Sequence, residues 1–193
     1  MPATAFPDHT LESAPAAARS GLAAITRKQG FLPAAAARMA TSPEVLSGFL
    51  RMNALFESTT LDQLSREVLS MTMATRNDCH VCVAIHTGVL TALDAEPALL
   101  AALREGTPLP DERLEALRRF VLAVLAANGA VDDAAIEAFT AHGYTPRNAL
   151  EVTLGIATYT LSTFANRMTG APVDAPLARF ARPLRAPGGR APE

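Results

Sequence analysis

The only two cysteines of the chain, Cys79 and Cys82, stand three positions apart in the segment NDCHVCVAIH (residues 77–86), together with His80 and His86. In a reducing compartment, a Cys-x-x-Cys pair is more often catalytic or metal-binding than a structural disulfide. The segment therefore predicts thiol chemistry, either a dithiol that cycles through a disulfide or a metal site.

The spacing of the two cysteines suits a reversible disulfide. If Asp78 caps a helix, Cys79 and Cys82 lie at positions i and i+3, with Cβ atoms about 5–6 Å apart on one face. A disulfide needs Cα atoms about 4.4–6.8 Å apart, so the pair can close and open with little backbone movement. The positive end of the helix dipole favours a thiolate, and we expect a lowered pKa for one or both thiols.

Two further side chains are placed to move protons for this dithiol. His86 lies four residues after Cys82, on the same helical stripe, whereas His80 is rotated by roughly 100° from Cys79 and is expected to face elsewhere. Glu67 lies at the margin of the apolar face of the preceding helix.

The helices at 61–76 and 79–93 are joined by a short turn and should pack antiparallel, which brings Glu67 near the level of His86 and Cys82. Such a group forms a proton relay that feeds a dithiol. The alternative for Glu67 is an edge residue that pairs with Arg66 or Arg118 in solvent.

The rest of the chain predicts the helices that hold this motif, and no stretch alternates at the period of a strand. Helix starts are indicated by Ser42-Pro43-Glu44, by Thr145-Pro146 and by a capping box at Thr60–Gln63. We predict an all-α helical bundle with helices at 14–29, 33–40, 43–56, 61–76, 79–93, 96–105, 111–127, 132–141 and 146–168.

The length of 193 residues predicts one domain over residues 1–170, followed by a Pro- and Arg-rich tail at 171–193. The tail is not expected to form regular structure of its own, and would be mobile or lie along a neighbour. Aromatic residues such as Phe49 and Tyr159 are expected in the core rather than in a pocket. Asn166 and Arg167 are expected to anchor a helix end or an interface.

Charge and hydropathy exclude two classes of partner. The formal net charge is −2, and Lys28 is the single lysine, so we expect no nucleic-acid partner. The stretch Ala149–Ala165 has the length of a membrane span but contains Glu151 and several hydroxyls, which predicts a buried core helix and no membrane partner. The first thirty residues lack a signal-peptide pattern, and we expect a cytoplasmic protein.

The pattern Glu67, Cys79-x-x-Cys82 and His86, written E-x11-CxxC-x3-H, resembles the carboxymuconolactone decarboxylase superfamily, in its alkylhydroperoxidase D-like (AhpD-like, peroxidase-related) branch. The flanking segments GFLPAAAARMATSPEVLSGFL, LSREVLSMTMATRNDC and FANRMTGAPVD agree with it. The resemblance covers roughly residues 12–175. One departure is Val81, where well-known members carry a histidine, with His80 one position earlier.

The resemblance implies an all-helical bundle that assembles as a dimer, trimer or hexamer, so we expect a homo-oligomer. It implies a hydroperoxide reductase that needs no cofactor and is reduced by a thiol or dithiol donor. By the family's pattern Cys82 attacks the peroxide and Cys79 resolves the sulfenic acid to a disulfide, with Glu67 and His86 relaying the proton. The helix dipole alone would favour Cys79 as the attacking sulfur. The decarboxylase branch lacks the CxxC pair, and we do not expect decarboxylation.

Three alternatives stay open. Cys79, Cys82 and His86 could hold a zinc ion, with Glu67 or His80 as the fourth ligand. The chain could instead be a helical oligomer whose dithiol only senses redox state. It could also be a related enzyme with another substrate.

Overall fold

The computed structural model describes residues 5–181, and over that range its regular structure is entirely helical, which confirms the all-α prediction. Each predicted helix is present, with ends that differ by a few residues. The helices are α1 (Ala16–Gln29), α2 (Ala34–Met39), α3 (Pro43–Glu57), α4 (Gln63–Arg76), α5 (His80–Ala92), α6 (Pro97–Glu105), α7 (Glu112–Ala126), α8 (Asp133–Thr140), α9 (Pro146–Thr169) and the 3₁₀ helix η1 (Ala175–Phe180).

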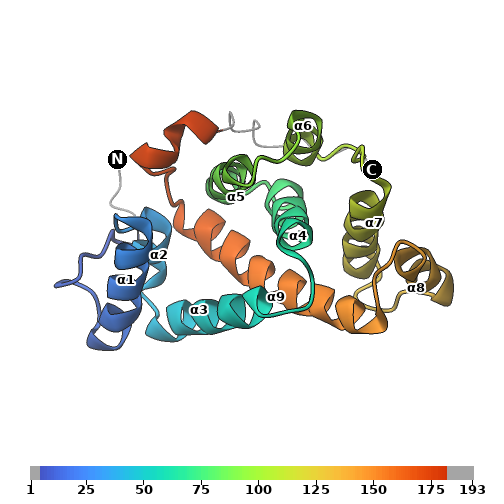
Figure 1. Ribbon diagram of the computed structural model, residues 1–193. Helices are drawn as coiled ribbons and strands as arrows, with labels where there is room; N and C mark the ends of the chain where they lie inside the picture. Colours follow the sequence, from blue (N-terminus) through green and yellow to red (C-terminus); the bar gives the residue numbers. More distant parts are fainter. Residues whose placement is uncertain (1–4, 182–193) are drawn as a thin grey trace.

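The long helix α9 organises the molecule (Figure 1). Its 24 residues span the bundle, with α1, α2 and α3 at one end and α7 and α8 at the other. Between these ends, α4 packs on α9 and turns back through residues 77–79 into α5, which packs on α4. This pair carries the cysteine motif.

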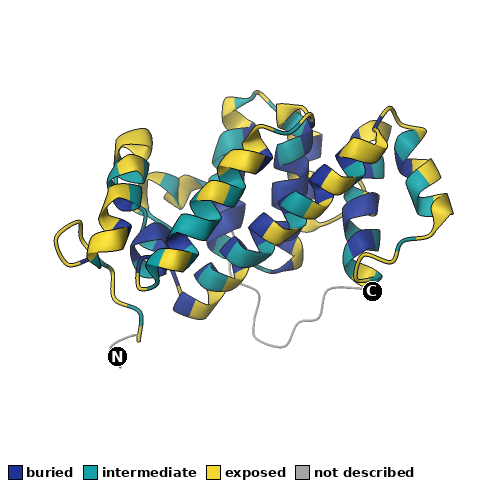
Figure 2. Cartoon of the chain, turned by 90° about the horizontal axis from the view of Figure 1, so that it is seen from below, coloured by how far each residue is buried: buried dark blue, intermediate teal, exposed yellow. Residues whose placement is uncertain are grey.

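Burial divides the described residues into two hydrophobic clusters. The larger one is built around α4, in which ten of 14 residues are buried, together with α5, α7 and α9. The smaller one contains Leu22, Met39 and Leu46 with several alanines, and it joins α1, α2 and α3. Figure 2 shows buried residues on the inner faces of the helices and exposed residues outside. The N-terminal helices therefore have an apolar cluster of their own.

A glycine sets the closest approach of α9 to its neighbours. A Cβ at Gly155 would lie 2.6 Å from the Phe56 ring and 2.8 Å from Leu69. Both of these side chains are fully buried, so the packing leaves little room for the methyl group. The absence of a side chain at this position is what allows α9 to lie close against α3 and α4.

Two helix caps differ from the prediction. The cap of α4 is Asp62, whose carboxylate accepts from the Ser65 N–H at 2.8 Å. The predicted capping box at Thr60 was wrong because Thr60 donates from its backbone N–H and its hydroxyl to Glu151 on α9. The cap of α5 is Cys79, and Asp78 instead takes the left-handed conformation, with φ at 50°.

The beginning of the predicted tail is ordered against α5. Residues 175–180 form η1, and the Phe180 ring lies where a Cβ at Gly88 would be 3.1 Å away. Arg104 on α6 donates to the Phe180 carbonyl at 3.0 Å. Of the two outcomes expected for the tail, these six residues show the second: they lie along a neighbour, α5, and their short 3₁₀ helix is held by packing and this hydrogen bond rather than by itself. Residues 182–193 lie outside the described range, and the boundary at 170 stays a prediction.

None of the helices between residues 5 and 181 combines the length and the hydropathy needed to cross a membrane.

Candidate active site

The turn at residues 77–79, which joins α4 to α5 and which we call the cysteine turn, is held by hydrogen bonds on both of its sides. At the start of α5 the Cys79 sulfur accepts the Cys82 N–H at 3.4 Å, so Cys79 is the N-cap. On the α4 side, the Asn77 amide donates to the Thr163 hydroxyl at 2.9 Å, and the Arg167 guanidinium donates to the Asn77 carbonyl. Arg167 thus anchors a helix end, which was one of the two roles predicted for it. Helix α9 holds the turn that carries the dithiol.

Both cysteines are free thiols and almost fully buried, with exposed fractions of 1% for Cys79 and 2% for Cys82. The pKa of Cys79 lies below its usual range, because its sulfur accepts a hydrogen bond from the Cys82 thiol and another from the Cys82 N–H, which outweigh burial. The pKa of Cys82 is raised well above its usual range, because its thiol donates to Cys79 and because it is buried. The sequence predicted a lowered pKa for one or both thiols, and the one that is lowered is that of Cys79, so the first thiolate of the pair forms on the Cys79 sulfur.

Glu67 and His86 form the predicted pair. The Nδ1 atom of His86 on α5 lies 2.8 Å from Oε2 of Glu67 on α4, and both side chains are about nine-tenths buried. The solvent-edge alternative is wrong, because Arg66 contacts Glu57 and Arg118 contacts Glu115. A carboxylate on Nδ1 orients the ring and leaves Nε2 to exchange a proton with another group.

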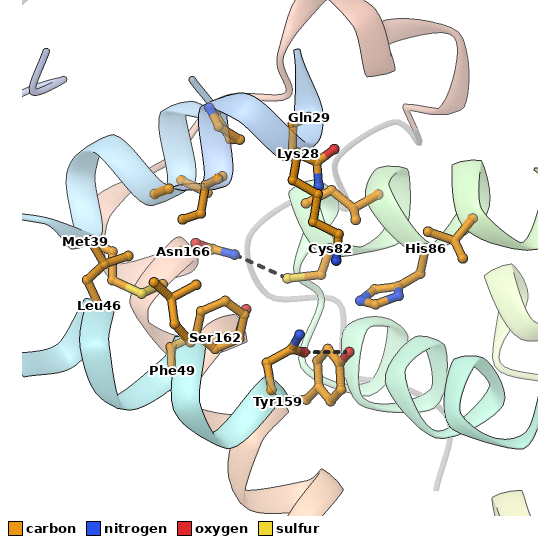
Figure 3. A pocket seen from close by; sticks show the side chains of 18 of the residues that line it. Lys28, Gln29, Met39, Leu46, Phe49, Cys82, His86, Tyr159, Ser162 and Asn166 are labelled. Atoms are coloured by element: carbon orange, nitrogen blue, oxygen red, sulfur yellow. Dashed lines mark hydrogen bonds between the residues drawn. The ribbon is translucent and has the colours of Figure 1, made fainter. Parts of the chain in front are cut away.

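A cavity of about 250 Å³ reaches Cys82 and His86 (Figure 3). One wall comes from α4, α5 and α9 and carries the reactive groups. The other comes from α1, α2 and α3, and its side chains are mainly apolar: Ile25, Met39, Leu46, Phe49 and Leu50. Cys79 is not among the lining residues, so Cys82 is the sulfur that a molecule in this cavity would meet.

Helix α9 contributes three lining residues that the sequence did not indicate as functional: Tyr159, Ser162 and Asn166. Asn166 donates from Nδ2 to the Cys82 sulfur at 3.3 Å. The Tyr159 ring packs edge-on against His86, with 5.1 Å between centroids, and burial raises the pKa of its hydroxyl. Tyr159 is buried as predicted and Phe49 is partly buried, but both line the cavity, so excluding them from a pocket was wrong. The available signal was polar residues on one face of a buried helix.

His80 is not among the residues that line the cavity. Within residues 5–181, no three His, Cys, Asp or Glu side chains are grouped so that they could hold a metal ion. The zinc alternative therefore has no ligand set in the described part of the chain.

No protein-family model and no curated protein matches the sequence. Solved structures do match. The AhpD core of a peroxidase-related protein from Ralstonia eutropha JMP134 is 24% identical, with a TM-score of 0.79 over 92% of this chain and 95% of that one. A peroxidase-related protein from Silicibacter sp. TM1040 is 19% identical, with a TM-score of 0.74 over 92% and 95%.

A third solved structure is a variant of the debrominase Bmp8 in complex with 2,3,4-tribromopyrrole. It is 14% identical to this chain, with a TM-score of 0.73 over 93% of this chain and 96% of the other. These matches confirm the AhpD-like fold that the resemblance implied.

Proposed function

We propose that this AhpD-like chain is a thiol-dependent hydroperoxide reductase, with Cys79 and Cys82 as its redox-active dithiol and with Glu67 and His86 as its proton relay. The observation that carries the proposal is that Cys82 and His86 line the same cavity. Glu67 lies at hydrogen-bond distance from the His86 ring and orients it. A nucleophile beside a positioned proton donor is the arrangement that peroxide cleavage needs.

The two cysteines have different roles in the proposed reaction. Cys79 holds the negative charge and Cys82 faces the substrate, so the Cys82 sulfur attacks the terminal oxygen of the hydroperoxide while its proton passes to the Cys79 sulfur. The O–O bond breaks, and the leaving alkoxide takes a proton from His86 to become an alcohol. Cys79 then attacks the Cys82 sulfenic acid, a disulfide forms, and water leaves with the Cys79 proton.

A donor must return two electrons and two protons to the disulfide. Since both sulfurs are buried, an external thiol would reach this bond through the cavity at Cys82. We propose a thiol or dithiol donor. The cytoplasmic location and the homo-oligomer stay predictions.

A second candidate reaction is reductive dehalogenation, because the wall formed by α1, α2 and α3 is apolar and a debrominase shares the fold. In that reaction the Cys82 sulfur takes the bromine from a carbon–bromine bond, and the carbon takes a proton. Cys79 then displaces bromide to form the same disulfide. Both reactions oxidise the dithiol by two electrons, and they differ only in the substrate.

The test is to count free thiols in reduced protein before and after one equivalent of cumene hydroperoxide or of 2,3,4-tribromopyrrole. Loss of two thiols with the hydroperoxide, and repeated turnover with dithiothreitol, would support the proposal. In Cys79→Ser, a dimedone adduct on Cys82 would identify the attacking sulfur. Loss with the bromopyrrole alone would favour the second candidate. Stoichiometric oxidation without turnover would favour a sensor, and two unreactive thiols would contradict both reactions.

A further inference from the structure

The amide oxygen of Asn166 is a buried acceptor without a partner. Asn166 is 3% exposed, and its Oδ1 makes no hydrogen bond within the described residues. Buried polar atoms are nearly always paired, because an unpaired one loses its water without compensation. An orphan acceptor on a residue that lines a cavity indicates a ligand that donates a hydrogen bond.

The position of this acceptor is set by the reactive sulfur. The same amide donates from Nδ2 to Cys82 at 3.3 Å, which turns Oδ1 away from the sulfur (Figure 3). The neighbouring residues Thr163 and Arg167 both bind Asn77, so α9 cannot rotate without breaking these contacts. One amide therefore offers a donor to the nucleophile and an acceptor beside it.

We propose that Asn166 binds the substrate, accepting on Oδ1 the hydrogen bond of the hydroperoxide O–H and so holding the terminal oxygen at the Cys82 sulfur. This inference rests on the proposed function and specifies its substrate class as oxidants with a terminal O–H. Dialkyl peroxides, which lack that proton, leave Oδ1 unpaired and are poor substrates.

The test compares two oxidants on Asn166→Ala and Asn166→Asp. Single-turnover oxidation is followed with cumene hydroperoxide, which has the O–H, and with diamide, an aprotic thiol oxidant. Asn166 also contacts Cys82 through Nδ2, so its substitution can change the reactivity of the sulfur toward both oxidants. The readout is therefore the rate with cumene hydroperoxide divided by the rate with diamide. We expect Asn166→Ala to lower that ratio about tenfold, the scale of one hydrogen bond to a buried group, and Asn166→Asp, which keeps an acceptor, to hold it near the wild-type value.

The outcomes separate this inference from the proposed function. An unchanged ratio in Asn166→Ala, with the wild type active toward hydroperoxide, would overturn the role of Asn166 alone. A wild type that reacts with diamide but not with hydroperoxide would overturn the proposed function. Equal rates of wild type with cumene hydroperoxide and dicumyl peroxide would also contradict substrate binding through the O–H.

A separate observation concerns the charge of the cavity. Glu67 is paired with His86 at 2.8 Å and Glu57 with Arg66 at 3.6 Å, but Lys28 has no ion-pair or hydrogen-bond partner among the described residues. In Figure 3 the Lys28 side chain extends from the end of α1 into the cavity. We infer that the preferred hydroperoxide has an anionic group, which Lys28 binds while the apolar wall holds the rest of the molecule. This inference too rests on the proposed function.

The matched control for Lys28 is Arg27, an exposed cation on the same helix that does not line the cavity. We expect Lys28→Met to reduce kcat/KM for a carboxylate-bearing cumene hydroperoxide by at most about fivefold relative to the neutral compound, because Lys28 is itself exposed, and Arg27→Met to leave the ratio unchanged. Raising the salt concentration should weaken the preference of the wild type for the carboxylate-bearing compound, because salt screens the attraction to Lys28. Equal losses for both compounds in Lys28→Met would overturn the inference, whereas no reaction with either in the wild type would overturn the proposed function.

Discussion

Two glutamates are buried among the described residues, Glu67 on α4 and Glu151 on α9, and their surroundings differ. Glu151 is 8% exposed and accepts from the Thr60 N–H at 3.0 Å, the Thr60 hydroxyl at 2.8 Å, Asn148 at 2.9 Å and Arg147 at 3.0 Å. Glu67 is 7% exposed, but within residues 5–181 its carboxylate has one hydrogen-bond partner, His86, and it borders the cavity.

The difference separates a structural carboxylate from one that can take part in chemistry. Burial alone would raise the pKa of Glu151, but the hydrogen bonds from Thr60, Asn148 and Arg147 outweigh it and hold that pKa below the usual carboxyl range. Its charge is therefore fixed, and it ties α9 to the loop before α4. Glu67 has a single partner that can itself carry a proton, so the pair can respond to what enters the cavity.

The largest effect should come from removing the charge of Glu67. Glu67→Gln removes the carboxylate that lies 2.8 Å from the His86 ring, and we expect the rate of hydroperoxide reduction to fall about 10²-fold, the lower end of general acid–base contributions. The measurement is steady-state peroxide consumption with dithiothreitol.

The matched control is Glu57→Gln. Glu57 lines the same cavity but is paired with Arg66. Its rate should stay within about twofold of the wild type. If Glu67→Gln and Glu57→Gln lower the rate of peroxide consumption by similar factors, that rate depends on the net charge of the cavity and not on the Glu67–His86 pair.

Glu151→Ala should show the opposite behaviour. Removing this acceptor leaves the donors of Thr60 and Asn148 unpaired, and we expect a loss of about 1–3 kcal/mol in the free energy of unfolding. Urea unfolding measures it. The peroxide rate per folded molecule should be unchanged, and a tenfold loss at full folding would remove the distinction between the two glutamates.

A smaller effect concerns the order in which the thiols ionise. Because the pKa of Cys79 is lowered and that of Cys82 is raised, thiolate absorbance at 240 nm should appear in two separate steps as pH rises. The first step should lie below the ordinary thiol value of 9.0. Cys79→Ser should abolish the first step, and a single step in the wild type at the ordinary value would contradict the assignment of charge to Cys79.

The smallest effect is the acid sensitivity that Glu151 adds. Its pKa is lower in the folded state than in the unfolded state, so the unfolded state binds its proton first as pH falls. The stabilisation is complete above the ordinary carboxyl value of 4.5 and is lost as pH falls toward the folded pKa. Glu151→Gln should therefore lose stability less steeply than the wild type between about pH 5 and pH 3, as measured by thermal unfolding.

Local sequence patterns predicted the part of the site that lies on α4 and α5. The spacing of Cys79, Cys82 and His86 on one helix, and of Glu67 on the preceding helix, depends on the 3.6-residue repeat and a short turn, and both can be read locally. The structure confirms that Glu67 and His86 meet.

The rest of the site depends on contacts between distant parts of the chain. Asn166 lies 84 positions from Cys82, and no local pattern says which face of α9 meets the cysteine turn. The cap at Thr60 failed for the same reason, because Glu151, 91 positions away, competes for its donors. The fold class and the helix positions were predictable, whereas the wall formed by α1, α2 and α3 was not.

The two hydrophobic clusters meet at the cavity, and this division bears on how the protein can evolve. Met39 and Leu46 shape the cavity from the smaller cluster and make no hydrogen bond to the dithiol or to the relay through their side chains. Cys82, Tyr159 and their polar neighbours belong to the opposite wall. Under the proposed function, mutations in α1, α2 and α3 would therefore change the size and shape of the molecules admitted while the wall that carries the dithiol stays intact, so new substrate preferences would arise on this scaffold without loss of the proposed chemistry.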